Sequence, residues 1–266
     1  MLADEKPRTA KLNGRLWGAR ARDWAEVAEP MQRCVYESVF QRICMGTQTN
    51  YLDVGCGSGL AAQLASERGA KISGVDAAEN LLAIAQSRVP AGQFRVGDLE
   101  ELPFADKTFE AVTGFNSFQY AANPDAALAE AKRVAKSGAT LVIVTWGKPE
   151  GMEAATLLGA LKALAPPPPS GTPGPFALSD ERALREFAAK AGLEPMEVVD
   201  VDSPWHYANL AMALRGLMSS GNAIRAAELS SDDAVRSAYT DALERFRQPD
   251  GSYRIGATFR CLFTRA

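Results

Sequence analysis

The sequence predicts an α/β protein built on a doubly wound, mostly parallel sheet. Short apolar runs alternate with segments of helical period from Tyr51 onward, as β-α units of a parallel sheet do. The run 139–146 (ATLVIVTW) is almost wholly apolar, which is typical of a strand covered on both faces. With 266 residues, 47% of them hydrophobic, the chain is long enough to bury the core of such a domain.

The first half of the chain contains the clearest elements. Apolar residues recur at three- and four-residue spacing over 15–44, which predicts helix, and Pro30 is expected to divide it. An Asn123-Pro124 pair predicts the start of a later helix, because asparagine caps and proline suits the first turn. Further helices are expected over 60–68 and 77–88. Strands are predicted over 51–54, 71–75, 93–96, 109–115 and 139–146.

The second half is less regular. Ala165–Pro175 is too rich in proline and glycine for regular structure and predicts a loop. A helix over 179–191 and a strand over 196–201 are expected next. Residues 207–247 are mostly helical in pattern, and 253–264 reads as one long strand. The absence of a sharp boundary favours a helical cap over a second domain.

Composition narrows the function. A net charge of −3 without a basic stripe argues against nucleic acid and favours a small, largely uncharged substrate. Four cysteines without a C-x-x-C pair, and one histidine, predict reduced thiols and no metal site. The polar start of the chain and the absence of an apolar run of about 20 residues predict a cytoplasmic protein without a membrane partner. The sequence gives no indication of the oligomeric state.

A glycine-rich turn, Asp53–Gly59 (DVGCGSG), follows the first predicted strand. Glycines allow a tight turn and let a ligand approach the backbone without a Cβ in the way. The helix that follows begins with free N–H groups, which can bind a phosphate or an amino-acid carboxylate. Ligands of open α/β sheets bind at the carboxyl ends of the strands, so this turn predicts a binding site.

Two acids follow at the ends of the next two strands. Asp76 is placed to accept hydrogen bonds from both hydroxyls of a ribose, and Asp98 to accept from the amino group of an adenine. An acid at a strand end can instead cap the next helix, and each signal alone is weak. In this order, the turn and the two acids together indicate a nucleoside cofactor.

The segment Asp53–Trp146 resembles the core of class I S-adenosylmethionine (AdoMet)-dependent methyltransferases, and most of all the small-molecule branch called methyltransferase type 11. The resemblance is carried by Asp53-x-Gly55-x-Gly57-x-Gly59, Asp76, Gly97-Asp98, Leu102-Pro103-Phe104, Phe109-Glu110-Ala111-Val112 and Ala131-Lys132-Arg133-Val134. It covers about a third of the chain strongly, and the last strand more loosely.

The resemblance implies a seven-stranded sheet of order 3-2-1-4-5-7-6 whose last strand is antiparallel. It implies an N-terminal helical lid over 1–46, a Rossmann-like core over 47–206 and 248–266, and a cap insertion over 207–247. In the family the glycine turn contacts the methionine part of AdoMet, and Asp53 lies near its amino group. The implied cofactor-binding residues are Asp53, Gly55, Cys56, Gly57, Gly59, Asp76, Ala77, Asp98, Leu99, Phe115 and Asn116.

The acceptor side is less defined. Aromatic residues of the lid, of the segment after the fourth strand and of the cap are expected to shape the substrate pocket: Trp17, Trp24, Phe118, Tyr120 and Trp205. Gln119 stands where many relatives carry a histidine, and a glutamine cannot act as a general base. His206, the one histidine, is the candidate base, although a partly exposed structural histidine fits the same position. No Asn-Pro-Pro-aromatic motif is present, which excludes enzymes that methylate the amino groups of nucleic-acid bases.

The sequence thus predicts AdoMet-dependent methyl transfer to an oxygen, nitrogen or carbon atom of a small molecule. Two alternatives remain at this stage. The first is a catalytically silent AdoMet-binding regulatory protein. The second is an NAD(P)-dependent oxidoreductase. Its G-x-G-x-x-G/A fingerprint can be aligned with Gly57-x-Gly59-x-x-Ala62, but this match begins two residues too late after the strand.

Overall fold

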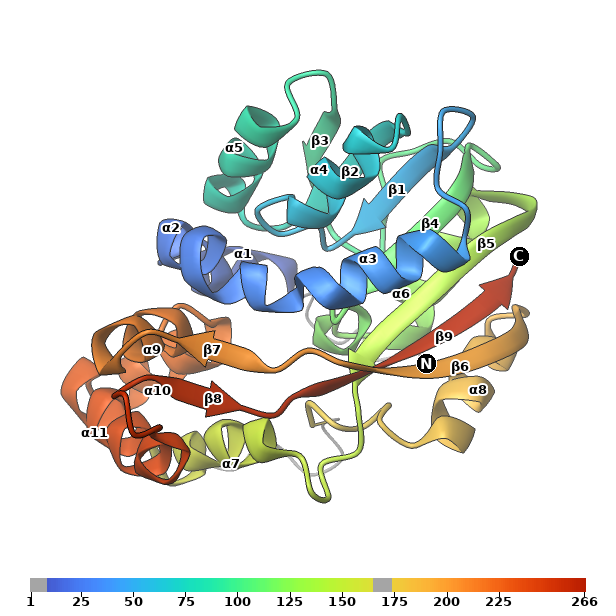
Figure 1. The fold of residues 1–266 in the computed structure, drawn as a ribbon. Helices are drawn as coiled ribbons and strands as arrows, with labels where there is room; N and C mark the ends of the chain where they lie inside the picture. The colour runs from blue at the N-terminus through green and yellow to red at the C-terminus, as the bar shows by residue number, and fades with distance from the viewer. Residues whose placement is uncertain (1–8, 165–173) are drawn as a thin grey trace, which may run out of the picture.

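A seven-stranded sheet of order β3-β2-β1-β4-β5-β9-β6 forms the centre of the molecule (Figure 1). The computed structural model describes residues 9–164 and 174–266. The strands are β1 (Asn50–Val54), β2 (Lys71–Asp76), β3 (Gln93–Val96), β4 (Phe109–Phe115), β5 (Ala135–Trp146), β6 (Glu194–Asp202) and β9 (Thr258–Arg265). Most of the proline-rich loop predicted over Ala165–Pro175 lies outside the described residues.

The predicted sheet topology is confirmed. β1 to β5 are mutually parallel, and β9 runs antiparallel between β5 and β6. The side chains of Leu141–Trp146 in β5 are all buried, as expected from their unbroken apolar run. The last strand of the chain is therefore inserted between β5, the apolar buried strand, and β6 at the edge of the sheet.

The long strand predicted over 253–264 is instead two strands. The shorter, β8 (Tyr253–Ile255), pairs with β7 (Trp205–Tyr207) in a separate two-stranded ribbon. Between β8 and β9, the backbone of Gly256 bonds to α7 (Glu153–Ala160), since the amide of Ala154 donates to the Gly256 carbonyl at 2.9 Å. The apolar pattern continues through this break and did not reveal it, because the interruption depends on a distant helix.

Helices cover both faces of the sheet (Figure 1). One face packs against α3, α4 and α5, and the other against α6 and α8. Asn123 caps α6 as predicted, with its side-chain oxygen accepting from the amide of Ala126 at 3.3 Å. The bounds are α3 (Arg33–Arg42), α4 (Leu60–Glu67), α5 (Glu79–Arg88), α6 (Pro124–Val134) and α8 (Glu181–Lys190).

The N-terminal segment is helical but not one continuous α-helix. It comprises α1 (Ala10–Gly18), α2 (Ala21–Asp23), a π-helical turn η1 (Trp24–Ala28), a 3₁₀ turn η2 (Glu29–Gln32) and then α3. Pro30 lies in the 3₁₀ turn and divides the segment as predicted. Gly14 lets α1 approach the β2–α5 connection, because a Cβ there would lie 2.2 Å from the carbonyl oxygen of Ala77. The segment therefore lies directly over the carboxyl end of β2.

The remaining helices gather beside this segment, as Figure 1 shows. They are α7, a 3₁₀ turn η4 (Leu161–Leu164), α9 (Leu210–Leu217), α10 (Gly221–Leu229), α11 (Asp232–Leu243) and a 3₁₀ turn η5 (Glu244–Phe246). Ion pairs join them to the N-terminal helices, such as Arg20 with Asp232 at 2.7 Å and Arg215 with Asp23 at 2.6 Å. Within the described ranges, no helix is long and apolar enough to span a bilayer.

Candidate functional site

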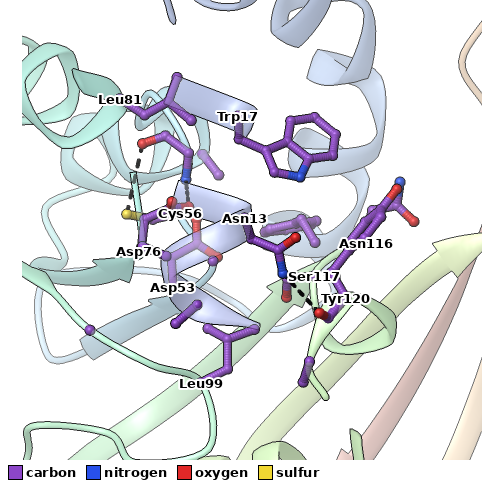
Figure 2. Close-up of a pocket in the computed structure, with 18 of the residues that line it drawn as sticks. Asn13, Trp17, Asp53, Cys56, Asp76, Leu81, Leu99, Asn116, Ser117 and Tyr120 are labelled. Carbon is purple, nitrogen blue, oxygen red and sulfur yellow. Dashed lines mark hydrogen bonds between the residues drawn. The ribbon is translucent and has the colours of Figure 1, made fainter. Parts of the chain in front are cut away.

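A pocket opens at the carboxyl ends of β1, β2 and β4, underneath α1 (Figure 2). Its empty volume is about 920 Å³, which includes open solvent at the mouth. The strand order reverses between β1 and β4, and ligands of doubly wound sheets bind at this switch point. The pocket is therefore where the sequence predicts the site.

The glycine turn forms the floor of the pocket. Gly57 has a φ of +55°, and a Cβ there would lie 3.6 Å from both the Glu29 Oε1 and the Trp24 Nε1 atoms. Gly59 serves another purpose, because a Cβ at this position would lie 2.7 Å from the Cβ of Ala85 in α5. Gly59 is not among the lining residues; it allows α4 and α5 to pack closely.

Asp76 supports the turn from the end of β2. Its Oδ2 accepts from the amide of Gly57 and its Oδ1 from the amide of Ala78, both at 2.9 Å. Figure 2 shows its carboxylate beside the turn. Burial raises the pKa of Asp76, and the backbone N–H groups oppose this. A carboxylate has about four lone-pair sites, so Asp76 keeps acceptor capacity for a hydroxyl of a ligand.

Asp53 ends a chain of buried hydrogen bonds. The hydroxyl of Thr113 donates to its Oδ1 at 2.9 Å, and the hydroxyl oxygens of Thr113 and Tyr51 lie 2.5 Å apart. Burial raises the pKa of Asp53 to about 7, and the nearby carboxylates of Glu29 and Asp76 act in the same direction, whereas the Thr113 bond lowers it. Asp53 therefore favours a positively charged ligand, which would offset the repulsion between its carboxylate and those of Glu29 and Asp76.

Glu29 is a pocket residue that the sequence did not indicate. It is 2% exposed, and its carboxylate accepts from the Ser58 hydroxyl at 2.6 Å, from the Leu60 amide at 3.3 Å and from the Arg88 guanidinium. Burial raises its pKa in spite of Arg88. The first amide of α4, expected to be free for a ligand, is thus occupied by the chain's own carboxylate. No local pattern signals this, because the partners are distant in sequence.

The lid side of the pocket is aromatic. The Trp17 ring packs edge-on against Trp24, with ring centroids 5.0 Å apart, and against Tyr120 at 5.5 Å. The side chains of Thr9 and Asn13 both donate to the carbonyl of Tyr120 at 2.9 Å, which fixes the start of α1 to the segment after β4 (Figure 2). Trp17, Trp24 and Tyr120 therefore line the pocket at the glycine turn, and their predicted contact with a substrate stays a prediction.

The remaining predicted cofactor residues lie along the strand ends. They line the same pocket and are Gly55, Cys56, Ala77, Asp98, Leu99, Phe115 and Asn116. Gln119 is not a lining residue, but its amide donates to the side chain of Asn116. Tyr36 of α3, which the sequence did not single out, also lines the pocket and packs edge-on against Phe115 at 4.7 Å.

Three predicted acceptor-side residues are not brought to this pocket. Phe118 is fully buried and packs under Gly114, where a Cβ would lie 2.2 Å from its ring. The Trp205 ring packs edge-on against Trp146 at 6.0 Å. His206 is exposed in β7, where its backbone amide lies 3.4 Å from the Met31 sulfur. Alternation along the short strand β7 turns Trp205 inward and His206 outward. The catalytic role of His206 stays a prediction.

Comparisons with known proteins agree with this geometry. Residues 52–143 match a family described as "Methyltransferase domain". The chain is 29% identical over 127 residues to a malonyl-[acyl-carrier protein] O-methyltransferase of Serratia marcescens, covering 48% of this chain and 50% of that protein. It is 36% identical over 95 residues to a demethylmenaquinone methyltransferase of Thermotoga maritima, covering 35% of this chain and 42% of that protein. The chain thus spans about half the length of the curated relatives it matches.

A solved structure shares the fold. It is a putative methyltransferase of Bacillus halodurans, with a TM-score of 0.58, 17% identity, and coverage of 86% of this chain and 97% of that one. The sheet order and the pocket at the glycine turn define a class I α/β domain. The match over residues 52–143, the methyltransferase relatives and the shared fold together support a class I AdoMet-dependent methyltransferase domain in this part of the chain.

Proposed function

We propose that this chain transfers the methyl group of AdoMet to a small-molecule acceptor. The observation that carries the proposal is one pocket in which Asp53, Asp76 and the open face of Gly57 meet under an aromatic lid. The residues present fit the cofactor, because a Cβ at Gly57 would occupy the floor of the pocket. AdoMet supplies an electrophilic methyl on its sulfonium, so the protein has to orient and shield rather than activate.

Each lining group has a task in this proposal. Asp76 accepts from the ribose hydroxyls with the lone pairs that Gly57 and Ala78 leave free, and Asp98 accepts from the adenine. Asp53 faces the cofactor's ammonium group. Trp17 and Tyr120 line the same pocket, and contact of a sulfonium with the face of either ring would contribute about 1 kcal/mol.

The acceptor is proposed only as a small molecule. Asn116 and Gln119, beside the end of β4, carry amides that cannot take up a proton. An oxygen or carbon acceptor therefore has to arrive activated or lose its proton to another group. The two relatives named above are described as acting on chemically different acceptors, so their similarity to this chain does not select one.

Calorimetry with S-adenosylhomocysteine and with NADH tests the cofactor. Saturable binding of S-adenosylhomocysteine alone is expected, and binding of NADH alone would overturn the proposal. Incubating the chain with AdoMet labelled in the methyl group and a cell extract, followed by mass spectrometry, is expected to show a labelled small molecule. Binding without any labelled product across a broad acceptor panel would instead favour a catalytically silent AdoMet-binding protein.

Affinity for AdoMet is expected to rise with pH because of Asp53. Its pKa is about 7 in the free protein, so below this value binding a cation at the ionised carboxylate requires release of a proton. Between about pH 5.5 and about pH 7 the dissociation constant is expected to fall by up to about tenfold per pH unit, while the ligand's amino group stays protonated. Calorimetry at constant ionic strength measures this slope.

Three variants assign the slope to Asp53. Asp53→Asn is expected to bind more weakly, with a flat profile over the same range. Thr113→Val removes a hydrogen bond that lowers the pKa of Asp53, so the binding profile of this variant should have its inflection at higher pH. Thr113→Ser keeps the hydroxyl and should return the inflection to the wild-type pH. A wild-type profile that is already flat would contradict the assignment.

A further inference from the structure

A buried donor at the pocket wall has no partner. Within the described chain, the indole Nε1 of Trp24 is buried and makes no hydrogen bond, although Trp24 is a lining residue. Leaving such a donor unpaired costs about 1–3 kcal/mol, and an unpaired group in a native structure calls for an explanation. A ligand that supplies the missing acceptor atom would remove this cost.

The position of the nitrogen defines the missing acceptor. Trp24 Nε1 lies 3.6 Å from the point that a Cβ of Gly57 would occupy, which is the open space above the glycine turn. Glu29, whose Oε1 lies equally close to that point, accepts from Ser58, Leu60 and Arg88 and not from the indole. Among the described residues the indole N–H has no acceptor, and a ligand that occupies the space above Gly57 would lie beside it.

Among the acceptor atoms of AdoMet, the carboxylate fits this position best. The ribose hydroxyls have Asp76 as their partner. The ammonium group is drawn toward the carboxylates of Asp53 and Glu29. The carboxylate of the ligand, in turn, cannot use the first amide of α4, because Glu29 occupies it at 3.3 Å. The uncharged indole N–H of Trp24, which has no acceptor among the described residues, is a donor on the pocket wall for this carboxylate.

We propose that the indole N–H of Trp24 binds the carboxylate of the amino-acid end of AdoMet. The inference rests on the proposed function and assigns one of its subsites to the lid. Trp24 is the first residue of the turn η1, and Asp23 before it and Glu26 within it both pair with Arg215 of α9. A carboxylate bound at Trp24 thus holds together the floor of the pocket and a lid segment that is itself fixed to the cap.

Two ligands that differ in the amino-acid end test the proposal. S-adenosylhomocysteine carries the carboxylate, whereas 5′-methylthioadenosine keeps the nucleoside thioether and lacks it. Trp24→Phe retains an aromatic ring without the N–H. It is expected to weaken S-adenosylhomocysteine binding by about tenfold or more, as for a hydrogen bond to a charged group. Binding of 5′-methylthioadenosine by the same variant is expected to change by less than about twofold.

Trp146→Phe is the matched control. Trp146 also has a buried, unpaired Nε1 within the described chain, but it does not line the pocket. This variant is expected to bind both ligands as the wild type does. The ligand-free Trp24→Phe protein should melt no lower than Trp146→Phe, because neither variant loses a hydrogen bond on substitution.

The outcomes separate this inference from the proposed function. Equal weakening of both ligands by Trp24→Phe would mean that the ring acts through packing, and no weakening would mean no contact; either result overturns the proposal. A wild-type chain that binds neither ligand would refute the proposed function itself. Should Trp24→Phe fail to fold, the wild-type indole N–H resonance of Trp24 is expected to move downfield with S-adenosylhomocysteine only.

Discussion

Arg88→Met is expected to lower the free energy of unfolding by about 3–5 kcal/mol, because it leaves a buried carboxylate without its counter-charge. Glu29 is only 3% exposed in its side chain and is paired with Arg88. Arg88 also donates to the carbonyls of Ser58 at 2.9 Å and Ala25 at 2.8 Å. It therefore joins the lid, the glycine turn and α5. Urea denaturation monitored by tryptophan fluorescence measures the loss.

A double-mutant cycle isolates the ion pair. Glu29→Gln combined with Arg88→Met should be more stable than Arg88→Met alone, since no buried charge remains. Arg88→Met should also be less destabilised at low pH: burial raises the pKa of Glu29, and its protonation removes the unpaired charge. As a control, Arg185→Met breaks an exposed pair with Glu181 and should cost no more than about 0.5 kcal/mol. Equal losses for Arg88 and Arg185 would contradict this account.

Asp76→Ala is expected to weaken S-adenosylhomocysteine binding by more than about a hundredfold. The substitution removes a charge-assisted acceptor for the ribose, and it also frees the amide of Gly57 that holds the turn. Both effects fall on the same ligand, so the loss should exceed that of a single hydrogen bond. Isothermal titration calorimetry at a fixed pH near neutral measures it.

Asp180→Ala provides a control for the loss of stability. Asp180 caps α8, accepting from the amide of Ala183 at 3.0 Å, and it does not line the pocket. Its removal should cost about 1 kcal/mol of stability and leave ligand affinity unchanged. Binding by Asp76→Ala within about threefold of the wild type would show that this acid does not hold the ligand.

Much of the fold could be read from local patterns. The period of apolar residues separated β-α units from the N-terminal helices, and the unbroken run in β5 identified the central strand. The break at Gly256 was missed because neighbouring residues keep the same apolar pattern. The carboxyl ends of β1 to β5 could be predicted from the sequence. The separation of β8 from β9 could not, because it depends on where α7 packs.

The candidate site divides in the same way. Asp53, Gly57, Asp76 and Asp98 could be predicted because each lies at or just after the end of a strand, and the ends of parallel strands meet at one edge of the sheet. Glu29 and Tyr36 could not, because they belong to helices whose orientation is set by packing. Trp24 and Trp205 were predicted for one pocket, yet only Trp24 lies there.

The sequence by itself determined the order of elements, the glycine turn and the acids that follow it, since these depend on backbone conformation and short-range periodicity. Tertiary structure alone decided the ion pair of Glu29 with Arg88, the raised pKa of Asp53 and the unpaired N–H of Trp24. These three features depend on burial and on which distant groups meet. Desolvation and pairing are properties of assembled surroundings, so no local stretch of the chain encodes them.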